Sequence, residues 1–205
     1  MIRDWIFKEN RLFWSTTLVF FVSILTLTVL SLFFIDQSWA QYFASPDRRN
    51  LWQFHRSITE VGAAEPYIAI ALIGLLFAKF RKRSAFFAAS LATCGLVIHL
   101  FKFLIGRSRP HRLPDHDPFV FDFFNFHHHF QSLPSGHSQT LFTAATFFSV
   151  LFPKASPYFF VFAFYFAMTR AFTIAHFVSD VILGAGLGII VTVITTRHLV
   201  QKYGS

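Results

Sequence analysis

Uncharged apolar runs of membrane-spanning length constrain this chain more than any other feature of its sequence. The first run extends from Leu12 to Ile35, 24 residues without a charged side chain. About 20 apolar residues cross the hydrocarbon core of a bilayer as a helix, whereas the apolar part of a secretory signal has roughly 7–15. The run therefore predicts a retained membrane helix. Hydrophobic residues make up 54% of the chain and charged residues 14%, a composition that favours a membrane protein over a soluble domain.

The lengths of the apolar segments divide the chain into six expected membrane helices. These cover approximately residues 12–35, 62–78, 84–105, 135–152, 157–175 and 179–196. The last two need a break between them, because residues 157–196 would measure about 60 Å as one helix, twice the hydrocarbon core. The polar stretch AHFVSD is the expected break, with Ser179 as the N-cap of the final helix and Asp180 in its first turn.

The fold class that follows is all-α, an integral membrane bundle of six transmembrane helices with a short N-terminal interfacial segment. That segment, MIRDWIFKENRLFW, mixes aromatic residues with charges, a composition typical of a helix lying along the membrane surface. The sequence shows neither an internal repeat nor a low-complexity tail, so residues 1–205 are expected to form a single transmembrane domain. The only cysteine, Cys94, lies in an apolar run, which excludes a disulfide framework.

Basic residues are distributed unequally between the two sides that six spans define. The side that holds both termini has ten Lys and Arg residues against two acidic residues, whereas the opposite side has eight of each. Because cytoplasmic loops are enriched in Lys and Arg, both termini are expected in the cytoplasm. The protein is then expected to be a multi-pass protein of the cytoplasmic (inner) membrane, with its outer loops facing the periplasm or the outside.

Three polar stretches fall together on the expected outer side, at the edge of the membrane. They are KFLIGRSRP (residues 102–110), LPSGHS (133–138) and RAFTIAHFVSD (170–180). A charged residue at the centre of a span costs about 2.5–3.5 kcal/mol, so such residues in an apolar chain indicate a membrane edge, a polar cavity or a functional site. The stretches supply eight candidate site residues: Lys102, Arg109, Arg170, Ser135, Gly136, His137, His176 and Asp180.

The three cations and the Ser-Gly pair favour the binding of a phosphoryl group. Three fixed cations near a low-dielectric surface favour a doubly negative group, and arginine matches phosphate oxygens with two parallel hydrogen bonds. Ser135 can cap the helix that begins at PSGH, and Gly136 allows a ligand to approach the free backbone N–H groups there. Phosphoryl transfer requires positioning and charge stabilisation, which these groups provide without a metal ion.

The two histidines and the aspartate complete a candidate catalytic set. His176 precedes Asp180 by four residues, a spacing that lets the carboxylate hold the imidazole in its nucleophilic tautomer. His137, when protonated, can donate a proton to the departing oxygen. The residues alone therefore predict a phosphatase that forms a covalent phosphohistidine.

In their order and spacing, the three stretches resemble the signatures of the type 2 phosphatidic acid phosphatase (PAP2) family. The matching patterns are K-x6-RP from Lys102, PSGH from Pro134 and R-x5-H-x3-D from Arg170, with Thr169 where the family commonly has serine. The resemblance implies a metal-independent bacterial phosphatase of lipid phosphomonoesters or pyrophosphates. It implies His176 as nucleophile, Asp180 as its orienter, His137 as leaving-group acid, and a set of phosphate ligands: Lys102, Arg109, Arg170, Ser135 and Gly136.

The expected substrate is a phosphate on a membrane lipid, and the sequence leaves four classes open: undecaprenyl pyrophosphate, phosphatidylglycerophosphate, phosphatidic acid and lipid A phosphate. A lipid-to-lipid phosphotransferase using the same site is an alternative, distinguished by whether free phosphate appears when no acceptor lipid is supplied. A transporter is a second alternative, which would place the charges at mid-membrane rather than at an edge. No cofactor, metal ion, nucleic acid or obligate protein partner is expected.

Other polar residues near the signatures are expected to have structural roles. Arg107, which fits no signature, is expected to reach the membrane surface from a helix end, and His99 is expected to be a packed core histidine. Residues 127–129, HHH, are not expected to bind a metal ion, because three consecutive side chains do not easily converge on one ion. The phenylalanine-rich loop 119–130 is expected in the membrane interface, as an anchor or as the lining of a lipid path.

Overall fold

The structure is a computed structural model that describes residues 2–113 and 115–203. Those residues form α-helices joined by turns and loops and contain no β-strand, so the all-α fold class is confirmed. The helices are α1 (Ile2–Ile6), α2 (Asn10–Phe34), α3 (Asp36–Ala44), α4 (Arg49–Ile58), α5 (Ala64–Leu76), α6 (Arg81–Ile105), α7 (Gly136–Leu151), α8 (Ser156–Phe172) and α9 (Val178–Tyr203).

A helix lies in each of the six ranges that the apolar runs predict. Among the described residues, four segments are long and apolar enough to cross a membrane: Asn10–Phe34, Pro46–Leu76, Arg81–Ile105 and Val178–Tyr203. The helices α7 and α8 have 16 and 17 residues, fewer than the roughly 20 that usually span a bilayer. A protein with several membrane-spanning helices is therefore supported, and the count of six spans stays a prediction.

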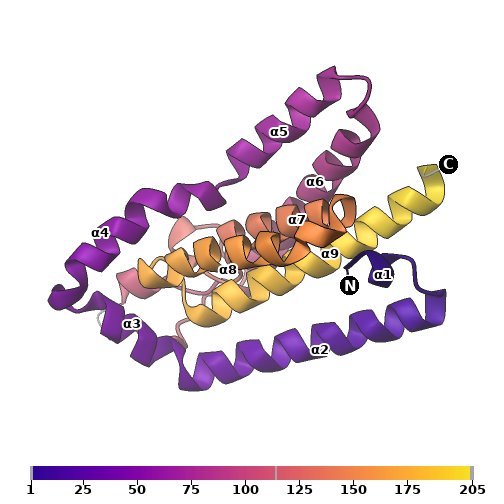
Figure 1. Cartoon of the computed structure of the whole chain (residues 1–205). Helices are drawn as coiled ribbons and strands as arrows, with labels where there is room; N and C mark the ends of the chain where they lie inside the picture. Colours follow the sequence, from indigo (N-terminus) through magenta and orange to yellow (C-terminus); the bar gives the residue numbers. More distant parts are fainter. Residues whose placement is uncertain (1, 114, 204–205) are drawn as a thin grey trace.

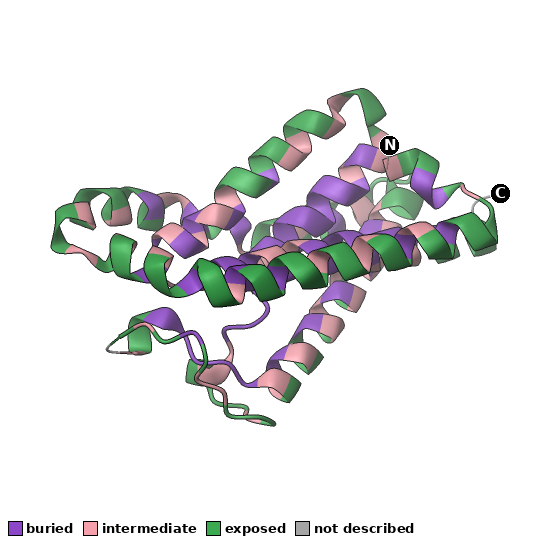
Figure 2. Ribbon diagram, turned by 90° about the horizontal axis from the view of Figure 1, so that it is seen from below, coloured by how far each residue is buried: buried purple, intermediate pink, exposed green. Residues whose placement is uncertain are grey.

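Helices α7 and α9 form the centre of the bundle. They pack against each other, α8 packs on α7, and α2 and α6 pack on α9. Buried residues are concentrated along these central helices, while the outer helices expose one face (Figure 2). A Cβ atom on Gly184 would lie 2.4 Å from the carbonyl oxygen of Ser135, so only glycine lets α9 approach the beginning of α7 so closely. This approach brings the second and third signatures together.

The connections between the helices lie at two opposite sides of the molecule. In Figure 1, both chain ends and the α5–α6 turn lie on the right, whereas α3, α4 and the α8–α9 turn lie on the left. The right side therefore holds the basic cluster KFRKR, residues 79–83, and the left side holds the stretch with His176. The order of the apolar runs predicts this separation of the connections, while their orientation in a membrane stays a prediction.

The predicted break between the last two helices is present, but its N-cap differs from the predicted one. Helix α8 ends at Phe172 and α9 begins at Val178, so Ser179 lies inside the first turn of α9 rather than at its N-cap. Asp180 lies in that first turn, as predicted, and its Oδ2 accepts a hydrogen bond from the backbone N–H of Phe177 at 2.9 Å. The carboxylate thus satisfies a backbone donor that the helix leaves unpaired.

The N-terminal segment folds onto the bundle. Trp5 and Ile6 of α1 are buried among residues of α7 and α9. The guanidinium group of Arg197, near the end of α9, donates hydrogen bonds to the carbonyl oxygens of Ile6 and Lys8. The buried side chains and the hydrogen bonds from Arg197 therefore hold α1 against the bundle. Its position at a membrane interface stays a prediction.

Candidate active site

The imidazole of His176 lies buried in the turn between α8 and α9, with one ring nitrogen engaged and the other available. Its Nδ1 lies 2.8 Å from the carbonyl oxygen of Ser132. A carbonyl oxygen only accepts hydrogen bonds, so Nδ1 carries the hydrogen and Nε2 keeps its lone pair. Burial lowers the pKa of His176 well below its ordinary value, and the nearby cations Arg109 and Arg170 lower it further. The ring is therefore neutral at neutral pH, the form a nucleophile requires.

Asp180 supports this arrangement through Ser132 rather than through a direct hydrogen bond. Its Oδ2 lies 3.6 Å from Nδ1 of His176, a distance longer than a hydrogen bond. The same Oδ2 accepts a hydrogen bond of 2.5 Å from the hydroxyl of Ser132, whose carbonyl faces the imidazole. Ser132, one residue before the second signature stretch, thus joins the carboxylate to the histidine. No sequence pattern marks Ser132, because it acts partly through its backbone.

Arg107 holds Asp180 from the other side, and the expectation that it reaches the membrane surface is wrong. The side chain is fully buried, and its guanidinium group donates to Oδ1 of Asp180 at 2.6 Å and to Oδ2 of Asp36 at 2.8 Å. It also donates to the hydroxyl of Ser179 at 2.7 Å. We refer to Arg107, Asp36, Ser179 and Asp180 as the buried ionic cluster.

Backbone geometry explains why Arg107 points inward. Gly106 ends α6 in the left-handed conformation, with φ +56°, which turns the chain sharply before Arg107. A Cβ atom on Gly106 would lie 1.6 Å from the carbonyl oxygen of Asp122, so no other residue fits this turn. The turn directs Arg107 toward α3 and α9 instead of allowing it to continue the helix toward the surface.

The three cations of the signatures surround His176 from three different elements. Lys102 lies buried in the last turn of α6, and Arg109 lies buried in the loop after it. Arg170, in the last turn of α8, is partly buried. All three act electrostatically on His176. A Cβ atom on Gly136 would lie 3.9 Å from Nζ of Lys102, so the start of α7 also faces this group. We call the space between the three cations and His176 the phosphate site.

Several donors in the phosphate site have no protein partner. Nε of Arg109, Nε of Arg170 and Nε2 of His137 are buried, and none has a hydrogen-bond partner among the described residues. A buried donor left unpaired costs about 1–3 kcal/mol, and more when it is charged. Phosphate oxygens are acceptors that would satisfy such donors, and arginine is well suited to bind them. The chemistry of the site therefore fits a phosphoryl group.

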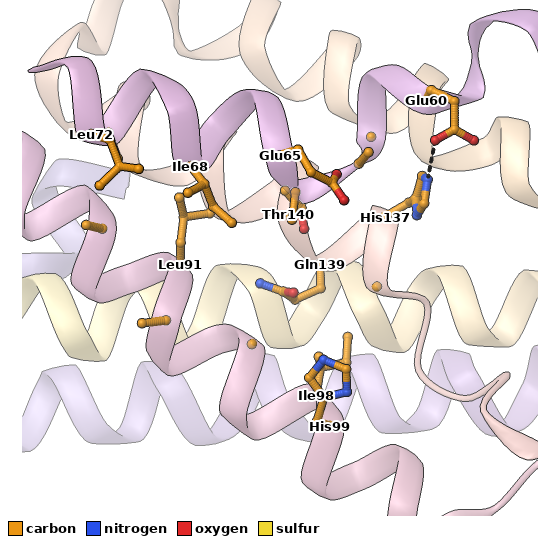
Figure 3. A pocket seen from close by; sticks show the side chains of 18 of the residues that line it. Glu60, Glu65, Ile68, Leu72, Leu91, Ile98, His99, His137, Gln139 and Thr140 are labelled. Atoms are coloured by element: carbon orange, nitrogen blue, oxygen red, sulfur yellow. Dashed lines mark ion pairs between the residues drawn. The ribbon is translucent and has the colours of Figure 1, made fainter. Parts of the chain in front are cut away.

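His137 lies in the first turn of α7, beside a carboxylate that the sequence analysis did not single out. Ser135 is the N-cap of α7, as predicted, and its Oγ accepts from the backbone N–H of Ser138 at 3.4 Å. Nε2 of His137 lies 4.0 Å from Oε2 of Glu60, which belongs to the turn between α4 and α5 (Figure 3). The side chain of Glu60 is 76% exposed, so a proton exchanged with His137 can reach solvent there.

A cavity of about 640 Å³ extends from the phosphate site between α5 and α6. Leu72 and Ile68 of α5 face Leu91 and Ile98 of α6 across it (Figure 3). Lys102, Gly136 and His137 also line it, at its polar end. We call this cavity the groove. His99 also lines the groove and is exposed, so the expectation that it packs in the core is wrong: the gap between α5 and α6 leaves that face of α6 uncovered.

The histidine run lies beside Arg109, whose backbone N–H donates to the carbonyl oxygen of His129 at 3.2 Å. Among the described residues, no group of three or more His, Cys, Asp or Glu side chains is arranged to hold a metal ion. Phe123, Phe124 and Phe126 are each more than half exposed, and Phe126 stacks on Phe103 of α6 with 4.3 Å between ring centroids. Exposed aromatic rings beside a membrane helix fit an interfacial anchor, and no phenylalanine of this loop lines the groove.

Two known proteins match part of this chain in sequence. Two lipid A 1-phosphatases are similar in sequence: that of Rhizobium etli is 38% identical over 104 residues, and that of Rhizobium johnstonii is 42% identical over 94 residues. These matches cover 51% and 46% of this chain. They span less than half of each relative, 45% and 38% of its length respectively.

Two crystal structures share the fold. LpxE of Aquifex aeolicus has a TM-score of 0.61 and 22% identity, covering 80% of this chain and 95% of that one. A transmembrane PAP2-type phosphatidylglycerolphosphate phosphatase of Bacillus subtilis has a TM-score of 0.63 and 21% identity, covering 91% and 96%. The family model of the PAP2 superfamily matches residues 83–203, more than half of the chain and all three signatures. The chain therefore belongs to the PAP2 superfamily.

Proposed function

We propose that this protein is a metal-independent phosphatase that removes a phosphate from a membrane lipid through a phosphohistidine intermediate. The observation that supports this most directly is the state of His176: neutral, held through Nδ1, and set among Lys102, Arg109 and Arg170. We further propose that the site faces the periplasm or the outside, with both termini in the cytoplasm. Membership of the superfamily and the names of the relatives support a lipid phosphate as substrate.

The proposed reaction has two displacement steps. Nε2 of His176 attacks phosphorus, the bond from phosphorus to the lipid oxygen breaks, and His137 gives its proton to that oxygen. Water then gives a proton to His137 and attacks phosphorus, the bond from phosphorus to Nε2 breaks, and inorganic phosphate leaves. Lys102, Arg109 and Arg170 stabilise the charge on the phosphoryl oxygens in both steps. Every group that takes part in these two steps belongs to the protein, the lipid or water.

The groove fits the apolar part of such a lipid. Its walls are mostly aliphatic side chains from α5 and α6, and one end opens at Lys102, Gly136 and His137. A lipid whose phosphate lies in the phosphate site can therefore place a hydrocarbon chain between the two helices. Among the four substrate classes, the names of the relatives favour a lipid A phosphate. The other three classes are undecaprenyl pyrophosphate, phosphatidylglycerophosphate and phosphatidic acid, and each also joins a phosphate to a hydrocarbon chain.

Free phosphate should appear when the purified protein, in detergent and EDTA, is given these lipids without an acceptor lipid. Phosphate release is measured for the four lipid classes and compared with and without added Mg²⁺ or Zn²⁺. We expect the same rate in all metal conditions, because positively charged side chains neutralise the phosphoryl group. A rate lost in EDTA and restored by a divalent ion would contradict the mechanism. Release that requires a second lipid would identify a phosphotransferase.

Substituting Gly95 with leucine should obstruct the groove and so slow the reaction of long-chain lipids selectively. Gly95 lines the groove, and a Cβ atom there has no heavy atom within 4 Å, so the new side chain projects into open space. Displacing about two methylenes of a bound chain costs roughly 1.6 kcal/mol, so kcat/KM for a long-chain lipid should fall about tenfold.

The comparison substrate for this prediction is p-nitrophenyl phosphate, which has no long chain. Leu96→Phe is the matched control, because Leu96 is the next residue of α6 and is 75% exposed, away from the groove. This substitution adds bulk outside the groove. If Gly95→Leu lowered the rate with both substrates to the same degree, the groove would not be the binding site of the chain.

A further inference from the structure

A second cavity, of about 630 Å³, adjoins the groove at Glu60, which lines both. Its walls come from the end of α3, from α4 and from the turn that contains His176. Arg170 and Glu60 line it, and both also belong to the surroundings of the phosphate site. Any molecule bound in this second cavity therefore lies next to a bound phosphoryl group. The reaction proposed above does not use it.

Helix α4 presents one basic face to the second cavity. Arg49, Trp52 and Arg56 are three and four residues apart, which places them on the same side of the helix, and all three line the cavity. The guanidinium group of Arg56 lies 4.8 Å from the ring centroid of Trp52. Within the described part of the chain, neither Arg49 nor Arg56 forms an ion pair with a carboxylate. Both charges are thus available to a ligand.

Four contacts fix this face relative to the phosphate site. Nε1 of Trp52 donates to the carbonyl oxygen of Thr173 at 3.1 Å. The buried ring of His55 lies against Phe172, 4.5 Å between centroids. The hydroxyl of Thr59 lies 2.8 Å from that of Thr169 and accepts a hydrogen bond of 3.3 Å from Arg170. Helix α4 is therefore held firmly on the end of α8, and its arginines keep a defined position beside Arg170.

The charge of the second cavity favours an anion. Three arginines line it, Arg49, Arg56 and Arg170, and the carboxylate of Glu60 is the single acidic group among its lining residues. His111 also lines it; burial, together with the nearby Arg109 and Arg112, lowers the pKa of His111, so its ring is neutral at neutral pH and does not add to this charge. The net positive charge lies beside a site that already accepts one phosphate, and arginine pairs well with a second one.

We propose that the second cavity is a headgroup subsite, in which Arg49 and Arg56 bind a second phosphate group on the polar headgroup of the lipid. This inference rests on the proposed function, because it assumes that the scissile phosphate lies beside His176. The substrate class is then a lipid with two separate phosphates on its headgroup, and the subsite distinguishes it from a lipid with one. The groove binds the hydrocarbon part of the same molecule.

The test measures selectivity with the full-length protein in detergent. The probes are lipid A with both phosphates, lipid A with only the scissile phosphate, and phosphatidic acid. We expect Arg49→Gln combined with Arg56→Gln to lower the ratio of kcat/KM for two-phosphate lipid A to that for one-phosphate lipid A by about tenfold or more, as expected for lost charge-assisted hydrogen bonds. Arg48→Gln is the control: Arg48 lies over Tyr42 and does not line the cavity.

The outcomes separate this proposal from the proposed function. An unchanged ratio, or an equal loss with both forms of lipid A, would overturn the headgroup subsite. If the double variant raised only the inhibition constant of inorganic phosphate, the headgroup subsite would also be overturned. The second cavity would then be the route by which the product phosphate leaves. Failure of the wild-type protein to release phosphate from phosphatidic acid or either lipid A would instead refute the phosphatase activity itself.

Discussion

His176→Asn should lower the rate of phosphate release by about 10⁴-fold or more, because it removes the proposed nucleophile from an otherwise complete site. The side-chain amide of asparagine can still donate to the carbonyl oxygen of Ser132, so the turn between α8 and α9 keeps its local hydrogen bond. The cations Lys102, Arg109 and Arg170 remain in place to bind the lipid phosphate. The loss should therefore appear in kcat, with a much smaller change in lipid binding.

Two measurements distinguish loss of the nucleophile from loss of the fold. Wild-type protein quenched with base during turnover of a ³²P-labelled lipid should retain label on histidine, and the His176→Asn variant should retain none. Thermal unfolding in detergent should be similar for both proteins. His198→Asn makes the same chemical change on an exposed position near the end of α9 and should leave turnover intact. Turnover by a folded His176→Asn variant would remove His176 from the nucleophilic role.

The positions of α2 and of α5 to α9 could be predicted because each of these helices is marked by a local signal. An apolar run indicates a membrane helix by its length alone, as for residues 12–35, and a proline or glycine marks where a run ends. Helices α3 and α4 have no such signal: α4 is held by a hydrogen bond from Trp52 to the carbonyl oxygen of Thr173 and by the packing of His55 on Phe172. Its placement depends on contacts with residues more than a hundred positions away, which a local pattern does not encode.

The candidate site shows the same division between local and distant information. Lys102, His137 and His176 could be predicted as site residues because each lies in a short motif with fixed spacing. Glu60, Ser132 and Arg107 were missed or misjudged, because their roles depend on distant partners. Arg107, for example, binds Asp36, 71 positions earlier, and Asp180, 73 positions later. An arginine just after a helix end normally reaches solvent, and only the turn at Gly106 directs this one inward.

Arg107→Leu should be the most destabilising single substitution in the buried ionic cluster. It removes the positive charge between two buried carboxylates, Asp36 and Asp180, and leaves both without their counter-ion. Breaking a buried pair in this way typically costs about 3–5 kcal/mol. The free energy of unfolding, measured by titrating SDS into the detergent-solubilised protein, should fall by that amount. Arg112→Leu removes an exposed cation from the same loop and should change stability by less than about 0.5 kcal/mol.

The pH dependence and a double variant test whether the lost charge is the cause. Burial raises the pKa of Asp36, and Arg107 opposes that rise. Without Arg107 the pKa should rise further, so the folded variant binds a proton that the unfolded chain releases above about pH 4. Because the folded state then binds more protons, stability of the variant should decrease as pH rises, and the defect should be larger at pH 8 than at pH 5. Adding Asp36→Leu to Arg107→Leu removes one carboxylate that has lost its counter-ion, so the double variant should recover part of the lost stability. A loss of stability that does not depend on pH and is not relieved by Asp36→Leu would instead indicate a packing defect.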